Sequence, residues 1–206
     1  MYAIVEDNNI TQYINNPKSV VIGDVRYPSK IFELWSQSEK EAIGIYEIIV
    51  DKTNYKDPAY YINTDSSYTF ADGQVTESWG TATPKRLEDE DAVDEDGENI
   101  LDDDGNQVIN YGLKTEKKRI VKQQASGLLE KTDWHNHKAL DDDTYTIPDN
   151  VKTYRANVRA KSNEMETQID ACNNVDELKT LYEYVNTGTK ENPVYERPLA
   201  EFPKEI

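Results

Sequence analysis

The 206-residue chain has one cysteine, two histidines and no long apolar run. The single cysteine, Cys172, cannot form an internal disulfide, which is typical of a protein from a reducing compartment. No apolar stretch approaches the ~20 residues that a membrane-spanning helix needs. The start of the chain also lacks the basic region and the apolar stretch of a signal peptide. The sequence therefore predicts a protein that is made, and acts, in a cytoplasm, with no membrane as its partner.

Motifs of catalysis and of metal binding are also missing. There is no Gly-x-Ser-x-Gly elbow, no phosphate-binding glycine loop and no dinucleotide fingerprint. His135 and His137 could converge on a metal only from an extended segment, and no third histidine completes a zinc site. Cys172 is expected to pack as a small apolar side chain. A hydrolase that uses His135 and Asp133 would need a pocket of which the sequence gives no sign. We therefore predict a protein that is not an enzyme and has no catalytic residue, metal or cofactor.

Acidic residues greatly outnumber basic ones, 40 against 23, which gives a formal charge of −17. Such a chain is repelled by nucleic-acid phosphates, so no nucleic-acid partner is expected, whereas a basic protein partner stays open. Eleven of the 17 positions in 88–104 are acidic and none is basic. This clustering argues against an acidic mimic of DNA, which would spread its carboxylates over one face.

The acidic stretch contains two similar units, each an Asp-Gly turn followed by a pair of apolar residues, at 96–101 and 104–109. The spacing does not fit a calcium-binding EF-hand, because placing Gly97 sixth in the loop puts Ala92 at the first ligand position. Asp-Gly turns between apolar residues are typical of short β-hairpins. We predict a solvent-exposed acidic β-ribbon or linker over residues 87–112.

Residues 1–86 carry mostly strand signals and predict an antiparallel β-rich N-terminal domain. Turn residues at 7–9 and at 72–73 each lie between apolar segments, which predicts two hairpins. Further strands are expected at 20–25, at 45–50 as a buried strand, and at 60–62. One short helix interrupts them, because Ser36 and Glu39 form a capping-box signature and Gly44 is placed to end the helix.

Residues 113–186 predict a helical domain made of a helical hairpin and a third short helix. Thr115 is expected to cap the first helix, and Pro148 or Asp149 to open the long second one. Asn174, with Glu177 three residues later, is expected to cap the third. Helical spacing predicts these inward-facing residues: Val121, Ala125 and Leu128; Val151, Tyr154, Val158, Met165 and Ile169; Leu178, Leu181, Tyr182 and Val185.

Two segments outside these helices complete the prediction. Residues 132–137 are polar and are expected to form a connection anchored by Trp134. The C-terminal tail, residues 187–206, contains three prolines and is therefore expected to be extended. The fold class predicted for the whole chain is α+β, with strands first and helices afterwards.

A motif in the helical region resembles a known family. The segment Ser-Gly-Leu-Leu-Glu-Lys-Thr-Asp-Trp at 126–134 is similar to the signature of phage tail assembly chaperone-like and tail fibre assembly proteins. Those domains continue, after a short polar loop, with a helix that carries a Tyr-Arg-x-x-Val/Leu-Arg pattern, which Tyr-Arg-Ala-Asn-Val-Arg at 154–159 matches. This chain departs from the pattern at Val151, where such domains often have Trp. The third helix has no counterpart in the pattern.

The resemblance implies a function that needs no active site. It implies a phage tail or tail-fibre assembly chaperone that binds a tail or fibre subunit in the host cytoplasm during virion assembly. The alternative is a minor structural component that is retained in the virion tail. The partner-binding residues implied are Trp134, Tyr154, Arg155 and Asp133. Alanine at Trp134 or Tyr154 is expected to weaken partner binding and leave the fold intact; the alternative is that both side chains pack the helices together.

Overall fold

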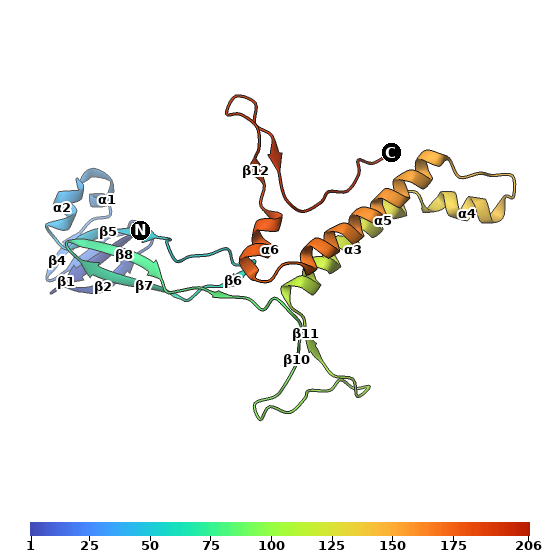
Figure 1. Cartoon of the computed structure of the whole chain (residues 1–206). Coiled ribbons are helices and arrows are strands. Elements are labelled where there is room, and N and C mark those ends of the chain that lie inside the picture. Colours follow the sequence, from blue (N-terminus) through green and yellow to red (C-terminus); the bar gives the residue numbers. More distant parts are fainter. The chain divides into compact units, whose positions relative to one another are not determined.

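The computed structural model describes all residues from Met1 to Ile206. Strands dominate the N-terminal part and helices the C-terminal part, so the predicted α+β class is confirmed (Figure 1). The chain divides into two compact units, Met1–Thr83 and Pro84–Ile206. No helix of the chain is both long enough and apolar enough to span a membrane.

The first unit is built on a five-stranded sheet in the order β2-β1-β5-β8-β7. Its strands are β1 (Tyr2–Glu6), β2 (Asn9–Ile14), β5 (Ile45–Asp51), β7 (Ser66–Ala71) and β8 (Gln74–Trp79). Both predicted hairpins are present, β1–β2 and β7–β8. Each turns through two residues with positive φ, Asp7 and Asn8 in the first and Asp72 and Gly73 in the second. Two such residues are what a tight turn between right-twisted strands requires.

The prediction of an antiparallel domain is wrong in one respect, because β5 and β8 pair in parallel. A parallel pair needs a long crossover between its strands. Here the chain supplies it with the segment that follows β5 and with β7, whose hairpin places β8 beside β5. Strand β5 is also less buried than predicted: Ile45 and Ile48 are buried, but Ile49 and Val50 are each nearly half exposed.

Both faces of this sheet carry apolar residues. On one face, Ile4, Ile14 and Ile45 pack with Val20, Ile31 and Phe32. The last three come from β3 (Val20–Ile22), which pairs with β4 (Val25–Tyr27), and from α1 (Ile31–Leu34). The other face buries a second cluster: Ala3, Val5, Ile48 and Val75.

The sheet curls around this second cluster. Tyr13 on β2 and Tyr68 on β7 belong to opposite edge strands, yet their ring centroids lie 4.7 Å apart. This contact closes the second face without a covering helix.

The predicted capping box is confirmed at α2 (Gln37–Glu41), where the Glu39 carboxylate accepts from Ser36 N at 2.8 Å and Glu39 N donates to Ser36 Oγ at 3.3 Å. Gly44 follows α2 with φ +83°, and a Cβ there would lie 2.6 Å from the carbonyl oxygen of Val5. Glycine is therefore required both by the conformation and by the space. Two short strands, β6 (Tyr61–Ile62) and β9 (Thr83–Pro84), come later in the chain.

The second unit begins with the acidic stretch, which forms short β-ribbons based on β10 (Glu90–Asp91) and β11 (Ile109–Asn110). Two further tight hairpins follow, closed by the bridges Val93–Asn99 and Leu101–Gln107. The three ribbons meet in a ring of backbone hydrogen bonds: Ile100 N donates to Ala92 O, Val108 N to Ile100 O, and Ala92 N to Val108 O. The ring residues are eight apart, so the two Asp-Gly units form a tandem repeat with one arm each (Figure 1).

Four helices follow: α3 (Leu113–Glu130), α4 (Asp133–Asp141), α5 (Asp149–Asp170) and α6 (Val175–Tyr182). α3 and α5 pack antiparallel, as ion pairs from Lys118 to Asp170 and from Lys122 to Glu166 show. The five residues predicted to share one face of α5 are all buried. Asn174 caps α6 as predicted, through its side chain and Glu177 N.

Three local predictions in this unit are wrong. Thr115 does not cap α3, which starts two residues earlier after Gly112, because Asp89 accepts a hydrogen bond from Gly112 N at 2.7 Å and fixes the entry. Residues 132–137 are not an irregular connection, since α4 begins at Asp133. Val185 does not face inward; it lies in β12 and is 54% exposed.

The C-terminal tail is also more structured than predicted. Strands β12 (Val185–Asn186) and β13 (Tyr195–Glu196) form a hairpin. The chain then returns along α5, and Leu199 is buried there at 2% exposure. Proline removes backbone donors but leaves side chains free to pack, so the residues after Pro198 are extended yet held against the helices.

Candidate functional site

The residues singled out by the sequence lie around the junction of α3, α4 and α5. Arg155 occupies its centre: Nη2 contacts the Asp133 carboxylate at 2.7 Å, and Nη1 donates to Leu129 O at 2.8 Å and to Thr132 Oγ1 at 2.7 Å. The Arg155 side chain is 9% exposed, and that of Asp133 is 45% exposed. The planar guanidinium suits such a set of acceptors. It therefore binds the last turn of α3 and the first of α4 to α5.

Tyr154 is buried beside this junction, at 5% exposure, in a cluster with Ala125 and Val158. Leu128, Leu129 and Phe202 pack against the cluster. The burial of Tyr154 supports the packing interpretation, and we now expect its alanine variant to destabilise the fold. Removing a buried aromatic side chain typically costs about 3–5 kcal/mol.

Trp134, in contrast, is 53% exposed on α4. Its ring stacks on His135, with centroids 3.7 Å apart. His135 Nδ1 hydrogen-bonds the Tyr145 hydroxyl, and Lys138 Nζ lies 4.4 Å from the centroid of the Tyr145 ring. The His135 ring, which Tyr145 of the following loop holds in place, thus supports the indole from one side and leaves much of it open to solvent.

α4 does not contribute to a buried core. None of its residues is buried, and Leu140 is 80% exposed. Three aspartates, residues 141–143, end the helix and begin the loop. The Thr144 hydroxyl and backbone N–H donate to Asp142, and these hydrogen bonds lower the pKa of its carboxyl. α4 and the start of the following loop therefore combine exposed apolar side chains with negative charge. This combination fits a protein partner better than a small molecule.

His135, His137 and Cys172 are the only histidines and the only cysteine of the chain. No group of three or more His, Cys, Asp or Glu side chains has the proximity that a metal needs. His135 and His137 are both on a helix, where positions i and i+2 do not face each other. Cys172 is buried at 7% exposure, and this burial raises the pKa of its thiol. A buried thiol with a raised pKa is a poor nucleophile, so the prediction that Cys172 packs as an apolar residue is confirmed.

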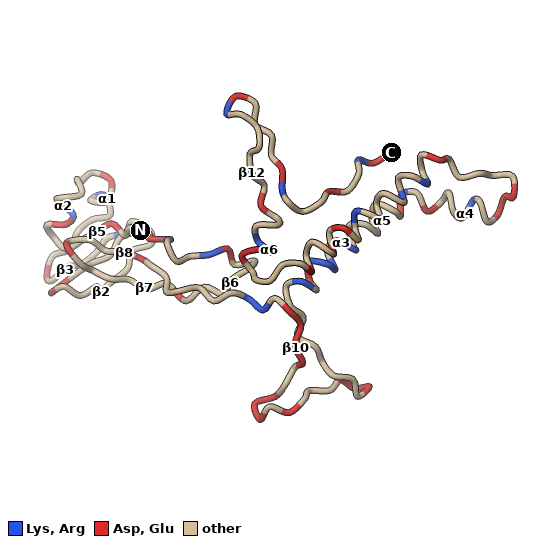
Figure 2. Tube along the Cα trace, in the orientation of Figure 1, with Lys and Arg blue, Asp and Glu red and all other residues tan.

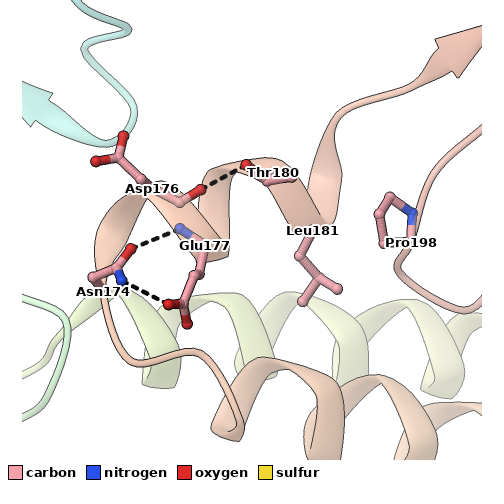
Figure 3. Close-up of a pocket in the computed structure, with 6 residues that line it drawn as sticks. All are labelled: Asn174, Asp176, Glu177, Thr180, Leu181 and Pro198. Carbon is pink, nitrogen blue, oxygen red and sulfur yellow. Dashed lines mark hydrogen bonds between the residues drawn. The ribbon is translucent and has the colours of Figure 1, made fainter.

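An open groove of about 540 Å³ lies between α6 and the returning tail, at Leu181 and Pro198 (Figure 3). The side chains of Asn174, Glu177 and Thr180 are already engaged in hydrogen bonds within α6 and its cap. Asn174 and Glu177 bond each other, at 2.9 Å through Glu177 N and at 2.7 Å through Asn174 Nδ2. Thr180 Oγ1 donates to Asp176 O at 2.8 Å. The groove therefore offers no converging free groups that would fix a ligand.

The acidic ribbons carry the densest charge of the second unit, as Figure 2 shows along β10 and the arms beyond it. Asp94 Oδ1 accepts from the backbone N–H groups of Asp96 and Glu98, and Asp102 Oδ1 accepts from those of Asp104 and Asn106. The hydrogen bond from Asn106 N is the largest of several that lower the pKa of the Asp102 carboxyl. Asp94 and Asp102 therefore stabilise the turns that they begin.

Comparison with protein-family models, with curated proteins and with solved structures finds no match to this chain. The sequence placed Asp133, Trp134, Tyr154 and Arg155 in one functional group, and the structure joins Asp133 to Arg155 directly. Nothing in the sequence indicated the support that His135, Lys138 and Tyr145 provide to Trp134, or the packing of Phe202 on the Tyr154 cluster. Both involve a contact across a loop or a chain return that no local spacing encodes.

Proposed function

We propose that this protein is a phage tail or tail-fibre assembly chaperone, which binds a tail or fibre subunit in the host cytoplasm during virion assembly. One observation carries the proposal. The two halves of the motif, around 126–134 and 154–159, meet through the ion pair and hydrogen bonds of Arg155. This junction holds Trp134 at the start of an exposed helix. The residues of the two motif segments thus form a single connected junction, which supports reading them as parts of one motif.

The physical role follows from the surface. An unassembled fibre or tube subunit exposes apolar surface, and a chaperone that covers it stabilises the free subunit by mass action. Exposed tryptophans are favoured anchors in protein interfaces. The net charge of −17 keeps the free chaperone soluble and favours a partner with basic side chains around the apolar contact. Both features are typical of binding, and neither requires a catalytic group.

The test is mass spectrometry of purified virions and of infected-cell lysate, combined with capture of the tagged protein. A chaperone is expected in the lysate, bound to a tail or fibre subunit, and absent from particles. A stoichiometric presence in particles would instead support the alternative role of a minor structural component of the tail. Failure to capture any tail or fibre subunit, together with absence from particles, would overturn both.

A further inference from the structure

The last residues of the chain lie along α5 and approach the junction just described (Figure 1). Leu199 N donates to Leu181 O at 3.0 Å. Gln168 on α5 also holds the residues on either side of Leu199, because its Nε2 donates to Pro198 O at 3.0 Å and its Oε1 accepts from Ala200 N at 2.8 Å. Backbone hydrogen bonds thus anchor the tail as far as Ala200.

From Phe202 onward, two side chains hold the chain to the helices. Phe202 packs against the cluster of Ala125, Tyr154 and Val158. Glu205 pairs with Lys131 at 2.6 Å, but these side chains are 53% and 60% exposed. Exposed ion pairs contribute little to stability because water and salt screen them. The terminal segment, residues 202–206, is therefore held mainly by one aromatic side chain.

The surface under this segment has the properties of a peptide-binding site. Its floor is the apolar cluster around Tyr154, and a groove of about 340 Å³, lined in part by Ala125, Leu129 and the exposed Arg159, continues beside it. The Tyr154 hydroxyl is buried without a hydrogen-bond partner. A buried unpaired hydroxyl costs free energy, so covering this surface carries a penalty that weakens the hold on the terminal segment.

We propose that the terminal segment is an internal ligand which a segment of the partner protein replaces. The partner segment that would replace it is an extended peptide with an aromatic residue followed three positions later by a carboxylate, as in Phe202 and Glu205. The apolar floor receives the aromatic ring, while Lys131 and Arg159 receive the negative charge. The proposal rests on the proposed function, since it names the surface and the chemistry through which a subunit would be bound.

An internal ligand leaves the site open in only a fraction of the molecules. The apparent affinity for an external ligand is the intrinsic affinity multiplied by that open fraction. A short tether gives the covering segment an effective concentration in the millimolar range. Weakening the cover should therefore strengthen external binding, the opposite of what loss of an ordinary packing residue would do.

The test uses the full-length protein and a synthetic peptide of residues 198–206. Amide shifts of the ¹⁵N-labelled chain are followed by NMR during titration with the peptide. We expect the Phe202→Ala chain to bind the peptide at least about tenfold more tightly than the unaltered chain, with shifts at 125–131 and 151–158. The Lys204→Ala chain is the matched control, because Lys204 is exposed, and it should behave as the unaltered chain does.

Peptides with Phe202→Ala or Glu205→Lys define the chemistry, and the first should show no binding while the second binds more weakly. Equal affinity of the Phe202→Ala and unaltered chains, or shifts confined to other regions, would overturn the internal ligand. Absence of peptide binding would overturn it as well. None of these results bears on the capture of a tail or fibre subunit, which decides the proposed function separately.

Discussion

Arg155 is the residue on which the junction of the three helices depends. Its guanidinium satisfies a carboxylate, a hydroxyl and a backbone carbonyl, and it is almost fully buried. Replacing one partner of such a set leaves the others unsatisfied, which costs more than the net contribution of the contacts themselves.

We expect Arg155→Met to lower the free energy of unfolding by about 2–4 kcal/mol. Urea unfolding followed by the helical circular dichroism signal measures this. Arg159→Met, one turn later and exposed, is the matched control and should change stability by less than about 0.5 kcal/mol. Equal stability of the two variants would show that the Arg155 contacts do not hold the junction.

Trp134 differs from Arg155, since its side chain is exposed and is not part of a buried cluster. Trp134→Ala should therefore leave the unfolding free energy nearly unchanged and weaken capture of the partner by about 2 kcal/mol, or roughly 30-fold, the loss typical of an interface anchor. Tyr195→Ala is the control, because Tyr195 is also exposed, at 64%, but lies on the β13 hairpin. Unchanged capture by the Trp134 variant would remove α4 from the binding surface.

Cys172 should react slowly with alkylating reagents in the native protein. Burial raises the pKa of its thiol, so less thiolate is present at any given pH than for a free cysteine. The rate of alkylation should therefore rise with pH only above the range in which an unfolded control reacts. Native and urea-unfolded rates, measured by mass spectrometry between pH 7 and 10, provide the comparison, and equal rates would contradict the buried placement.

At the scale of elements, turns and caps decide where the strands and helices meet. Gly44 is the clearest case, because it connects α2 to β5 with positive φ and because an added Cβ there would clash with the Val5 backbone. The pairing of β1 with β5 begins one residue later, at Ile45. The turn therefore sets the register of the central strands.

Gly44→Ala should lower the free energy of unfolding by at least about 2 kcal/mol, from the left-handed backbone strain together with a clash that only backbone movement relieves. Gly73→Ala is the control: its φ is +74°, but its added Cβ would meet nothing within 4 Å. It should cost only the backbone term, about 1 kcal/mol. Thermal unfolding of both variants measures the difference, and equal losses would mean that the contact with Val5 is unimportant.

At the scale of the whole molecule, each of the two units has apolar clusters of its own. Substitutions that share no contacts usually act independently. Hydrogen exchange should therefore show faster exchange in β1 and β5 for Gly44→Ala with α3 and α5 unchanged, and the reverse for Arg155→Met. Faster exchange throughout the chain in either variant would show that the units unfold as one.

Much of the fold could be predicted from the sequence, because its signals are local. Two hairpins follow from turn residues that tolerate positive φ, the capping box at Ser36 from hydrogen bonds within one turn, and the buried face of α5 from helical periodicity. The acidic charge and the shortage of cysteine and histidine are likewise properties of the sequence itself. The hairpins, the capping box and the helix face all depend on residues a few positions apart, whose relative geometry is set by the local backbone conformation.

Tertiary structure decided the rest, since the remaining features join residues that are distant along the chain. The parallel pairing of β5 with β8 depends on the crossover between them, and strand composition does not encode direction. Tyr154 and Trp134 have similar aromatic character, yet packing buries the first and leaves the second exposed. The packing of Phe202 on the Tyr154 cluster is decided in the same way. Burial depends on which surfaces pack together, and residues distant along the chain form those surfaces only in the tertiary structure.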